Sequence, residues 1–251
     1  MKTQLPLLLA IVGIVLSDVP LKDAHAADQL TGDVSSRLIA ITSNYAGAEL
    51  ILFGSRIGEG DVVAVVRGPT QSDVVRRKTR FAGIWVNTEA LIFDEVPGFY
   101  AVAASRPLPE IAKQALWSQL QIGAEYLKLD PREDVTDVKV YPYREALINN
   151  KEKGGLYLRQ VGKINFIGNT LFRTSVELPA YAPVGGYFVM FYLIEGGEVV
   201  ETRNTFFFIN KTGLERAVFD FAINEPAAYG LLAVAIAVFA GWLAGVMFRR
   251  A

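Results

Sequence analysis

The pattern of apolar and polar residues predicts two β regions with a helical segment between them. The first, residues 36–105, holds short runs rich in Val, Ile and Ala, separated by turn residues such as Gly58-Glu59-Gly60 and Pro97-Gly98. Short strands at this spacing are typical of a β-sandwich. The expected strands are Leu38–Thr42, Ala48–Phe53, Asp61–Arg67, Asp73–Arg77, Phe81–Val86, Ala90–Phe93 and Tyr100–Ala104.

One tyrosine in this region suggests the kind of sandwich. Tyr100 stands two residues before Val102, and Val102 occupies the position where an immunoglobulin domain carries its second cysteine. We therefore expect residues 27–105 to form an immunoglobulin-like β-sandwich. In such a domain the hydroxyl of the corner tyrosine bonds to backbone and fixes a strand crossover.

The middle of the chain, residues 106–155, reads as a helical connector. Two prolines, Pro107 and Pro109, end the first β region, and glycine at Gly154-Gly155 is typical of a helix end. The expected elements are a helix at Glu110–Leu127, a strand at Val135–Tyr141 and a second helix at about Tyr143–Lys151.

The second β region, residues 156–210, contains two strongly aromatic runs. The expected strands are Ile164–Ile167, Thr170–Leu178, Tyr187–Ile194 and Val199–Ile209, with a hairpin turn at Glu195-Gly196-Gly197-Glu198. The aromatic side chains fit either a sandwich core or a partner-binding face. The sequence leaves open whether the two β regions form one domain or two.

The last part of the chain predicts a membrane anchor. Ala227–Phe248 carries no charge and is long enough for a transmembrane helix, placed at 226–248. Arg249 and Arg250 follow in a short tail, 249–251, and favour the cytoplasmic side. Before the span, residues 211–225 predict an amphipathic juxtamembrane helix that begins at the capping box Thr212-Gly213-Leu214-Glu215.

The N-terminus predicts export of everything before that anchor. Leu5–Leu16 is apolar over the length of a signal-peptide core, and Ala24-His25-Ala26 matches a cleavage site. We expect a signal peptide at 1–26; an uncleaved signal anchor would give the same topology. The expected location is the inner (cytoplasmic) membrane, single-pass, with the N-terminal domain periplasmic and the C-terminus cytoplasmic.

Small residues recur every four positions within the span. They are Ala233, Ala237, Gly241 and Gly245, which share one ridge of a helix. Such ridges let a second helix approach closely, although Ala and Gly are also common in membrane helices without a partner. The ridge predicts packing against a second copy or against another membrane protein.

Composition excludes several kinds of chemistry. The chain has no cysteine, and its single histidine, His25, lies in the predicted signal peptide. A mature protein without either residue type cannot build a Ser-His-Asp triad, a cysteine nucleophile or a zinc site on His or Cys. The acidic run Asp130–Asp137 lacks EF-hand spacing. We expect no catalytic residue, metal or cofactor, and the balance of 25 basic and 26 acidic residues predicts no nucleic-acid partner.

Four arginines are the candidate contacts for a small anion. Arg76, Arg77 and Arg80 form a basic cluster with Lys78, and Arg67 ends a preceding strand. A basic run of this kind also serves as a solvated strand edge that resists pairing with other strands.

Several segments together resemble a family of alphaproteobacterial single-pass transmembrane proteins of unknown function. The segments are Ala48–Phe53 leading into Asp61–Pro69, Gly155-Leu156-Tyr157, Leu171-Phe172-Arg173 with Leu178-Pro179, Pro183-Val184-Gly185 with Tyr187, Lys211–Glu215, and Tyr229-Gly230 with Gly241-Trp242. The resemblance implies an exported domain on an inner-membrane anchor. It also implies an association with permeases of the sulfite/taurine exporter type.

The hypothesis that follows is a non-enzymatic periplasmic binding or accessory protein that partners another inner-membrane protein. A membrane-tethered protein that binds a small ligand or anion is the alternative. A carboxylate-based hydrolase is a third interpretation, although general acid–base chemistry most often uses histidine.

Overall fold

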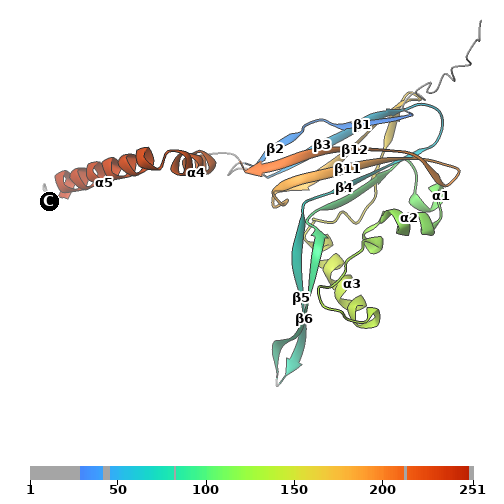
Figure 1. The fold of residues 1–251 in the computed structure, drawn as a ribbon, viewed down its shortest axis with the longest axis horizontal. Coiled ribbons are helices and arrows are strands. Elements are labelled where there is room, and N and C mark those ends of the chain that lie inside the picture. The colour runs from blue at the N-terminus through green and yellow to red at the C-terminus, as the bar shows by residue number, and fades with distance from the viewer. Residues whose placement is uncertain (1–28, 42–45, 82, 212–213, 249–251) are drawn as a thin grey trace, which may run out of the picture.

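The computed structural model describes residues 29–41, 46–81, 83–211 and 214–248, which form a β domain, a helical layer and two C-terminal helices (Figure 1). The predicted signal peptide, its cleavage site, the first two residues of the capping box and the tail with Arg249 and Arg250 lie outside the described residues.

Two sheets pack face to face. The smaller has the order β1-β3-β10-β9 and the larger β2-β12-β11-β4-β7-β8. The strands of the smaller sheet are β1 (Leu30–Val34), β3 (Gly47–Arg56), β10 (Leu171–Pro179) and β9 (Asn165–Ile167). Those of the larger are β2 (Leu38–Ile41), β12 (Glu198–Lys211), β11 (Gly185–Glu195), β4 (Asp61–Arg67), β7 (Tyr100–Ala104) and β8 (Gly162–Lys163). Each sheet takes strands from both β regions of the sequence, which are therefore two halves of one β structure.

Strands β4 and β7 of the larger sheet are buried on both faces. Along β4, Val62, Ala64 and Val66 face the core between the sheets. The alternate residues Val63 and Val65 face a second core on the other side. A strand covered on both faces reads as a continuous apolar run, which is how β4 appears in the sequence.

Helices cover that second face (Figure 1). They are α1 (Leu108–Ile111), α2 (Gln114–Leu120), the 3-10 turn η1 (Ala124–Tyr126) and α3 (Asp137–Lys153). The single helix predicted at Glu110–Leu127 is wrong, because the backbone breaks at Ala112 and again at Gln121, where φ is 54°.

The strand predicted at Val135–Tyr141 is also wrong, because Asp137–Tyr141 forms the first turn of α3. The buried side chains of α3 are Val140, Tyr143, Leu147 and Lys151. Their spacing of three and four residues is that of one helix face packed on a core. The helix ends at Lys153, before the predicted glycine pair, and Gly155 has a φ of +63°.

A long hairpin projects from the body (Figure 1). It consists of β5 (Thr70–Phe81) and β6 (Ile84–Pro97). Three short strands were predicted here, and one of them, Phe81–Val86, in fact spans the hairpin turn. The base of the hairpin belongs to the second core through Val75, Leu91, Phe93 and Val96.

Two tyrosines tie backbone segments together. The Tyr187 hydroxyl donates to the carbonyl oxygen of Pro183, four residues upstream, at 2.8 Å. The Tyr100 hydroxyl bonds instead to the helical layer: it donates to Gln121 O and accepts from Gly123 N, each at 2.9 Å. The corner role predicted for Tyr100 is therefore wrong; its hydroxyl does bond to backbone, but it holds helices to the sheet.

Two helices follow β12. These are α4 (Leu214–Asn224) and α5 (Pro226–Phe248), which extend away from the β domain in Figure 1. Pro226–Met247 is long and apolar enough to cross a membrane, and no part of it is buried against the rest of the described chain.

Candidate functional site

The aromatic strands β11 and β12 divide their side chains between the core and an open surface. Tyr187 and Phe207 are fully buried between the sheets and stack with ring centroids 4.8 Å apart. Their neighbours Phe188, Phe206 and Phe208 point to the opposite face and are 60%, 48% and 46% exposed. The sandwich-core interpretation therefore holds for Tyr187 and Phe207, while Phe188, Phe206 and Phe208 remain open to solvent in the described chain.

The exposed aromatic side chains form one surface. Phe188 lies opposite Phe206 in the ladder, and Leu38 of β2 lies opposite Phe208. The rings of Phe206 and Phe208 meet edge to face at 5.8 Å, and the Arg37 guanidinium lies 6.0 Å from the Phe206 centroid. We call Leu38, Phe188, Phe206 and Phe208 the aromatic face. It occupies the part of the larger sheet nearest to the point where β12 leads into α4.

A cleft of about 760 Å³ adjoins the aromatic face. It opens between the hairpin base, the larger sheet and the loop after α2. The lining residues used below are Arg67, Asp94, Glu95, Gln121, Lys128 and Asp130. Phe188 lines it as well and connects it to the aromatic face. We call it the Arg67 cleft.

Arg67 binds the C-terminal end of α2 in this cleft. Its Nη2 donates to the carbonyl oxygens of Leu120 and Gln121, each at 3.1 Å, and so satisfies the last carbonyls of α2. Its Nε is buried and has no hydrogen-bond partner among the described residues. Burial of the nearby phenol raises the pKa of Tyr100 to about 12, so this hydroxyl stays neutral at physiological pH.

The acidic side chains of the cleft are mostly engaged. Arg132 binds Asp94 through two hydrogen bonds of 2.8 Å and, with Ser72, lowers the pKa of this carboxyl to about 2. Asp130 lies 3.4 Å from Lys128. Glu95 sits in a β-bulge with a φ of 56°. Charges of both signs therefore line the cleft.

The other candidate arginines lie elsewhere. Arg76 and Arg77 line a separate hollow of about 230 Å³ beside Tyr143 of α3. Arg80 lies further along the hairpin, opposite Trp85. The fold does not bring these three residues together with Arg67.

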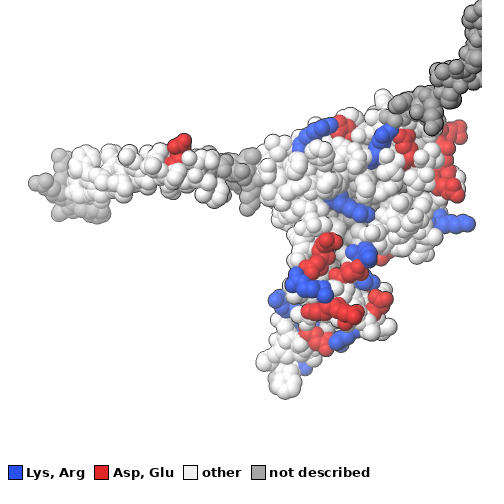
Figure 2. Space-filling model, in the orientation of Figure 1, with Lys and Arg blue, Asp and Glu red and all other residues white. Residues whose placement is uncertain are grey.

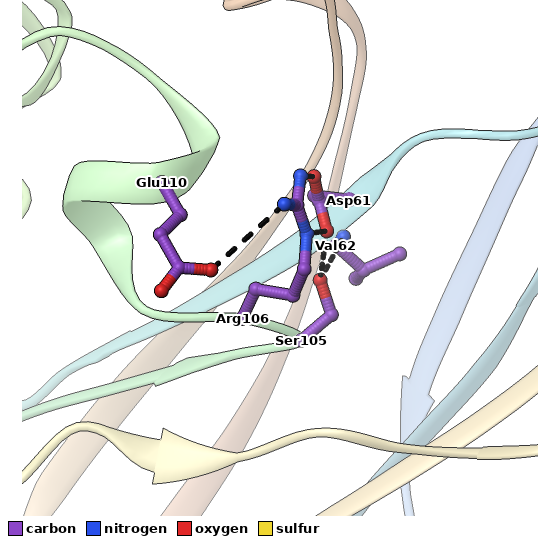
Figure 3. A network of polar contacts seen from close by, with 5 residues as sticks. All are labelled: Asp61, Val62, Ser105, Arg106 and Glu110. Atoms are coloured by element: carbon purple, nitrogen blue, oxygen red, sulfur yellow. Dashed lines mark hydrogen bonds and ion pairs between the residues drawn. The ribbon is translucent and has the colours of Figure 1, made fainter.

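A polar network that the sequence did not reveal joins the start of β4 to the end of β7 (Figure 3). Arg106 donates to both carboxylate oxygens of Asp61, at 2.9 and 2.5 Å, and Ser105 Oγ donates to Asp61 at 2.7 Å. The Arg106 hydrogen bond is the main reason that the pKa of Asp61 is lowered. Glu110 lies 4.0 Å from Arg106. Because the Asp61 carboxylate accepts hydrogen bonds from both Arg106 and Ser105, the network holds β4 against the segment that leads into α1.

The small-residue ridge of α5 is open. A Cβ atom added at Gly241 or Gly245 would meet nothing within 4 Å. Ala233 and Ala237 precede these glycines on the same side of the helix. Within the described chain, the ridge is thus free to take a helix from another molecule.

Comparison with known proteins supports a membrane protein, in agreement with the long apolar helix α5. Residues 29–250 match the model of the family described as "Putative transmembrane protein (Alph_Pro_TM)". No curated protein and no solved structure matches the chain. The match covers the β domain, the helical layer and the apolar C-terminal helix in one stretch, and the chain belongs to this family of transmembrane proteins.

Proposed function

We propose that this protein is a non-enzymatic, membrane-anchored binding or accessory protein that engages another membrane protein. The observation that carries the proposal is the aromatic face, an open apolar surface beside the segment that leads to the anchor. Exposed apolar patches that include several large side chains commonly mark interaction sites, and Phe is enriched at such interfaces.

The pattern along β12 supports a binding role. On the face that carries Phe206 and Phe208, the preceding alternate residues are Thr202 and Asn204, and the following one is Asn210. The same strand face thus changes from polar to aromatic and back again. A solvated strand face has no need of aromatic residues at these two positions, since Thr202, Asn204 and Asn210 show that polar residues fit on either side of them.

The span adds a second contact to this proposal. The ridge of Ala233, Ala237, Gly241 and Gly245 allows close helix packing. A partner that binds both the ridge and the aromatic face must itself sit in the membrane and rise above it. A permease of the sulfite/taurine exporter type, implied by the family resemblance, would meet that description.

An immunoglobulin-like sandwich is part of the same proposal. The order β1-β3-β10-β9 corresponds to strands A-B-E-D of that fold, and β12-β11-β4 to G-F-C. Tyr187 stands at the start of the strand that corresponds to F and bonds four residues upstream, as a tyrosine corner does. Such domains are common scaffolds for binding surfaces.

We further propose that the β domain is periplasmic and that the C-terminus is cytoplasmic in the inner membrane. Arg249 and Arg250 at the end of the span favour this orientation. The chain has no cysteine, so a single introduced cysteine can show on which side of the membrane its position lies. In intact spheroplasts a membrane-impermeant maleimide should label Lys113→Cys and leave Arg250→Cys unlabelled. Labelling of Arg250→Cys alone would reverse the proposed topology.

Co-purification in mild detergent from native membranes tests the partner. The variant Phe206→Ser/Phe208→Ser should lose a membrane protein that the wild type retains. Phe53→Ser is the matched control, because Phe53 is 45% exposed on the outer face of the smaller sheet. Carrying the domain on an unrelated span should also weaken the association. Equal recovery with all of these forms would refute the proposal.

The Arg67 cleft supports a second candidate function, binding of a small anion. The buried Nε of Arg67 has no partner in the described chain, and an anion could supply one. A ligand that binds only the folded state raises the unfolding midpoint. Sulfate should therefore stabilise the wild type and leave Arg67→Gln unchanged; equal shifts in both would refute binding at this arginine.

A further inference from the structure

The distal part of the hairpin has chemistry unlike the rest of the molecule. We call residues 76–88 the finger. Beyond the last contacts with α3, its described side chains are exposed, with Val86 alone partly covered. The finger leaves the flank of the β domain near the end that leads to α4 (Figure 1). No core therefore accounts for the apolar side chains that it carries.

Those apolar side chains gather at the tip. Phe81, Ile84 and Trp85 are 72%, 63% and 68% exposed. Phe81 lies opposite Ile84 and points to one side of the ribbon, while Trp85 lies opposite Arg80 and points to the other. Figure 2 shows the tip as an uncharged end beyond the charged band around α3. Each side of the ribbon thus carries an exposed apolar side chain at its end.

The finger is also cationic. Arg76, Arg77, Lys78 and Arg80 are its charged residues, and no acidic residue occurs between 76 and 88. The whole chain, by contrast, has a net charge of −1. The cations begin immediately behind the apolar tip, so the finger presents aromatic groups first and positive charge behind them.

We propose that the finger inserts its tip into the interface of an anionic bilayer, the same bilayer that α5 spans. Trp and Phe settle at the boundary between acyl chains and headgroups, and Lys and Arg bind the anionic headgroups beside them. The span keeps this bilayer within reach at high effective concentration. Only the tip enters, because the open edges of a two-stranded ribbon need water for their unpaired backbone groups.

Trp85 provides the probe. The chain has three tryptophans; Trp117 is buried at 3% exposure, and Trp242 lies in α5. Replacing Trp242 by Phe in the full chain leaves Trp85 as the exposed fluorophore. This protein is reconstituted at low density in vesicles of phosphatidylglycerol or of phosphatidylcholine, each with and without brominated acyl chains. We expect brominated phosphatidylglycerol to quench Trp85 and to shift its emission to the blue.

Charge variants test the role of the cations. Arg76→Gln/Lys78→Gln/Arg80→Gln should lose most of the quenching, while Lys113→Gln/Lys153→Gln/Lys163→Gln, which removes three exposed lysines elsewhere, should keep it. Arg77 stays in place because it faces Tyr143 and Glu89 at the base of the finger. Unchanged emission of Trp117 and an unchanged unfolding midpoint show that a variant is folded.

Three results would overturn the proposal. One is unquenched Trp85 in brominated phosphatidylglycerol, which is expected if the tip binds a protein and not lipid. The second is equal quenching in both lipids. The third is quenching only when the brominated lipid is in added, protein-free vesicles, which would place the tip in a facing bilayer. None of these results bears on the aromatic face, so the proposed function is tested separately.

Discussion

Replacing Lys151 by Met should loosen the attachment of the helical layer to the hairpin. Lys151 is buried on α3, with 7% of its side chain exposed, and its Nζ lies 2.7 Å from Asp73 Oδ2 at the base of β5. Met keeps the length and apolar stem of the side chain but removes the charge. The carboxylate of Asp73 then loses its cation in a site that water reaches poorly.

The size of the effect follows from burial. Removing one partner of a fully buried ion pair costs about 3–5 kcal/mol. Asp73 is 24% exposed and also accepts a hydrogen bond from Gln71, so part of the loss is compensated. We expect Lys151→Met to lower the free energy of unfolding by about 2–3 kcal/mol. For a chain of this size, that loss lowers the thermal unfolding midpoint by about 5–10 °C.

A double-mutant cycle separates the ion pair from other effects. Thermal unfolding of the full chain in mild detergent, followed by circular dichroism, is measured for the wild type, Lys151→Met, Asp73→Asn and the double variant. Asp73→Asn in the Lys151→Met background should restore about 1–2 kcal/mol, because no unpaired charge remains. Strictly additive losses, or a loss below about 0.5 kcal/mol for Lys151→Met, would show that the pair does not hold the layer.

Two further predictions concern the tyrosines. Tyr187→Phe should lower the free energy of unfolding by about 1–2 kcal/mol, because it leaves the Pro183 carbonyl without its donor. Calorimetry would measure the loss, and an unchanged unfolding midpoint would contradict the prediction. The pKa of Tyr100 is about 12 in the folded state against about 10 when unfolded, so its contribution is present below pH 10 and is lost as pH rises to 12. Unfolding midpoints measured from pH 9 to 12 should therefore fall less steeply for Tyr100→Phe, and parallel curves would contradict the assignment.

The parts of the fold that the sequence predicted well are those with strong local signals. The predicted bounds of β4 and β7 coincide with the observed ones, because each is a short apolar run between turn residues. The Gly196-Gly197 turn is present with φ values of 59° and 87°. The apolar C-terminal helix needed only its length and composition to be recognised.

Two of the errors have a shared cause, since each concerns which partner a side chain meets across the fold. Val135–Tyr141 alternates like a strand, yet Val138 and Tyr141 are exposed and Val140 packs on the second core. Tyr100 and Tyr187 both lie near the start of a strand that follows a Gly-containing turn. Their hydroxyl groups differ in partner: that of Tyr187 bonds to Pro183, four residues upstream, and that of Tyr100 bonds to the backbone at Gln121 and Gly123.

Counting along the ladder from the sequence alone would have misplaced the aromatic face. The turn at Gly196-Gly197 fixes the register of β11 against β12, with an irregularity between Leu193 and Ile194. With that bulge known, Phe188 falls opposite Phe206, and both lie on the face opposite to Phe207. The bulge adds one residue to the count, and the sequence gives no separate sign of it. A count without it exchanges the buried and exposed aromatic residues.

Two of the open apolar surfaces, the aromatic face and the tip of the finger, are the ones on which the two proposals rest. The helical layer covers Tyr192 and Ile194 and stops before Phe188, so the uncovered part of the larger sheet is the part nearest to α4. The finger leaves the flank near that same end (Figure 1). A domain that served only as a spacer would be stable with polar residues at both places. The aromatic face lies beside the segment that leads to α4, and the finger starts near the same end of the domain, so both support the proposal of a protein that works at the membrane surface and engages a partner there (Figure 1).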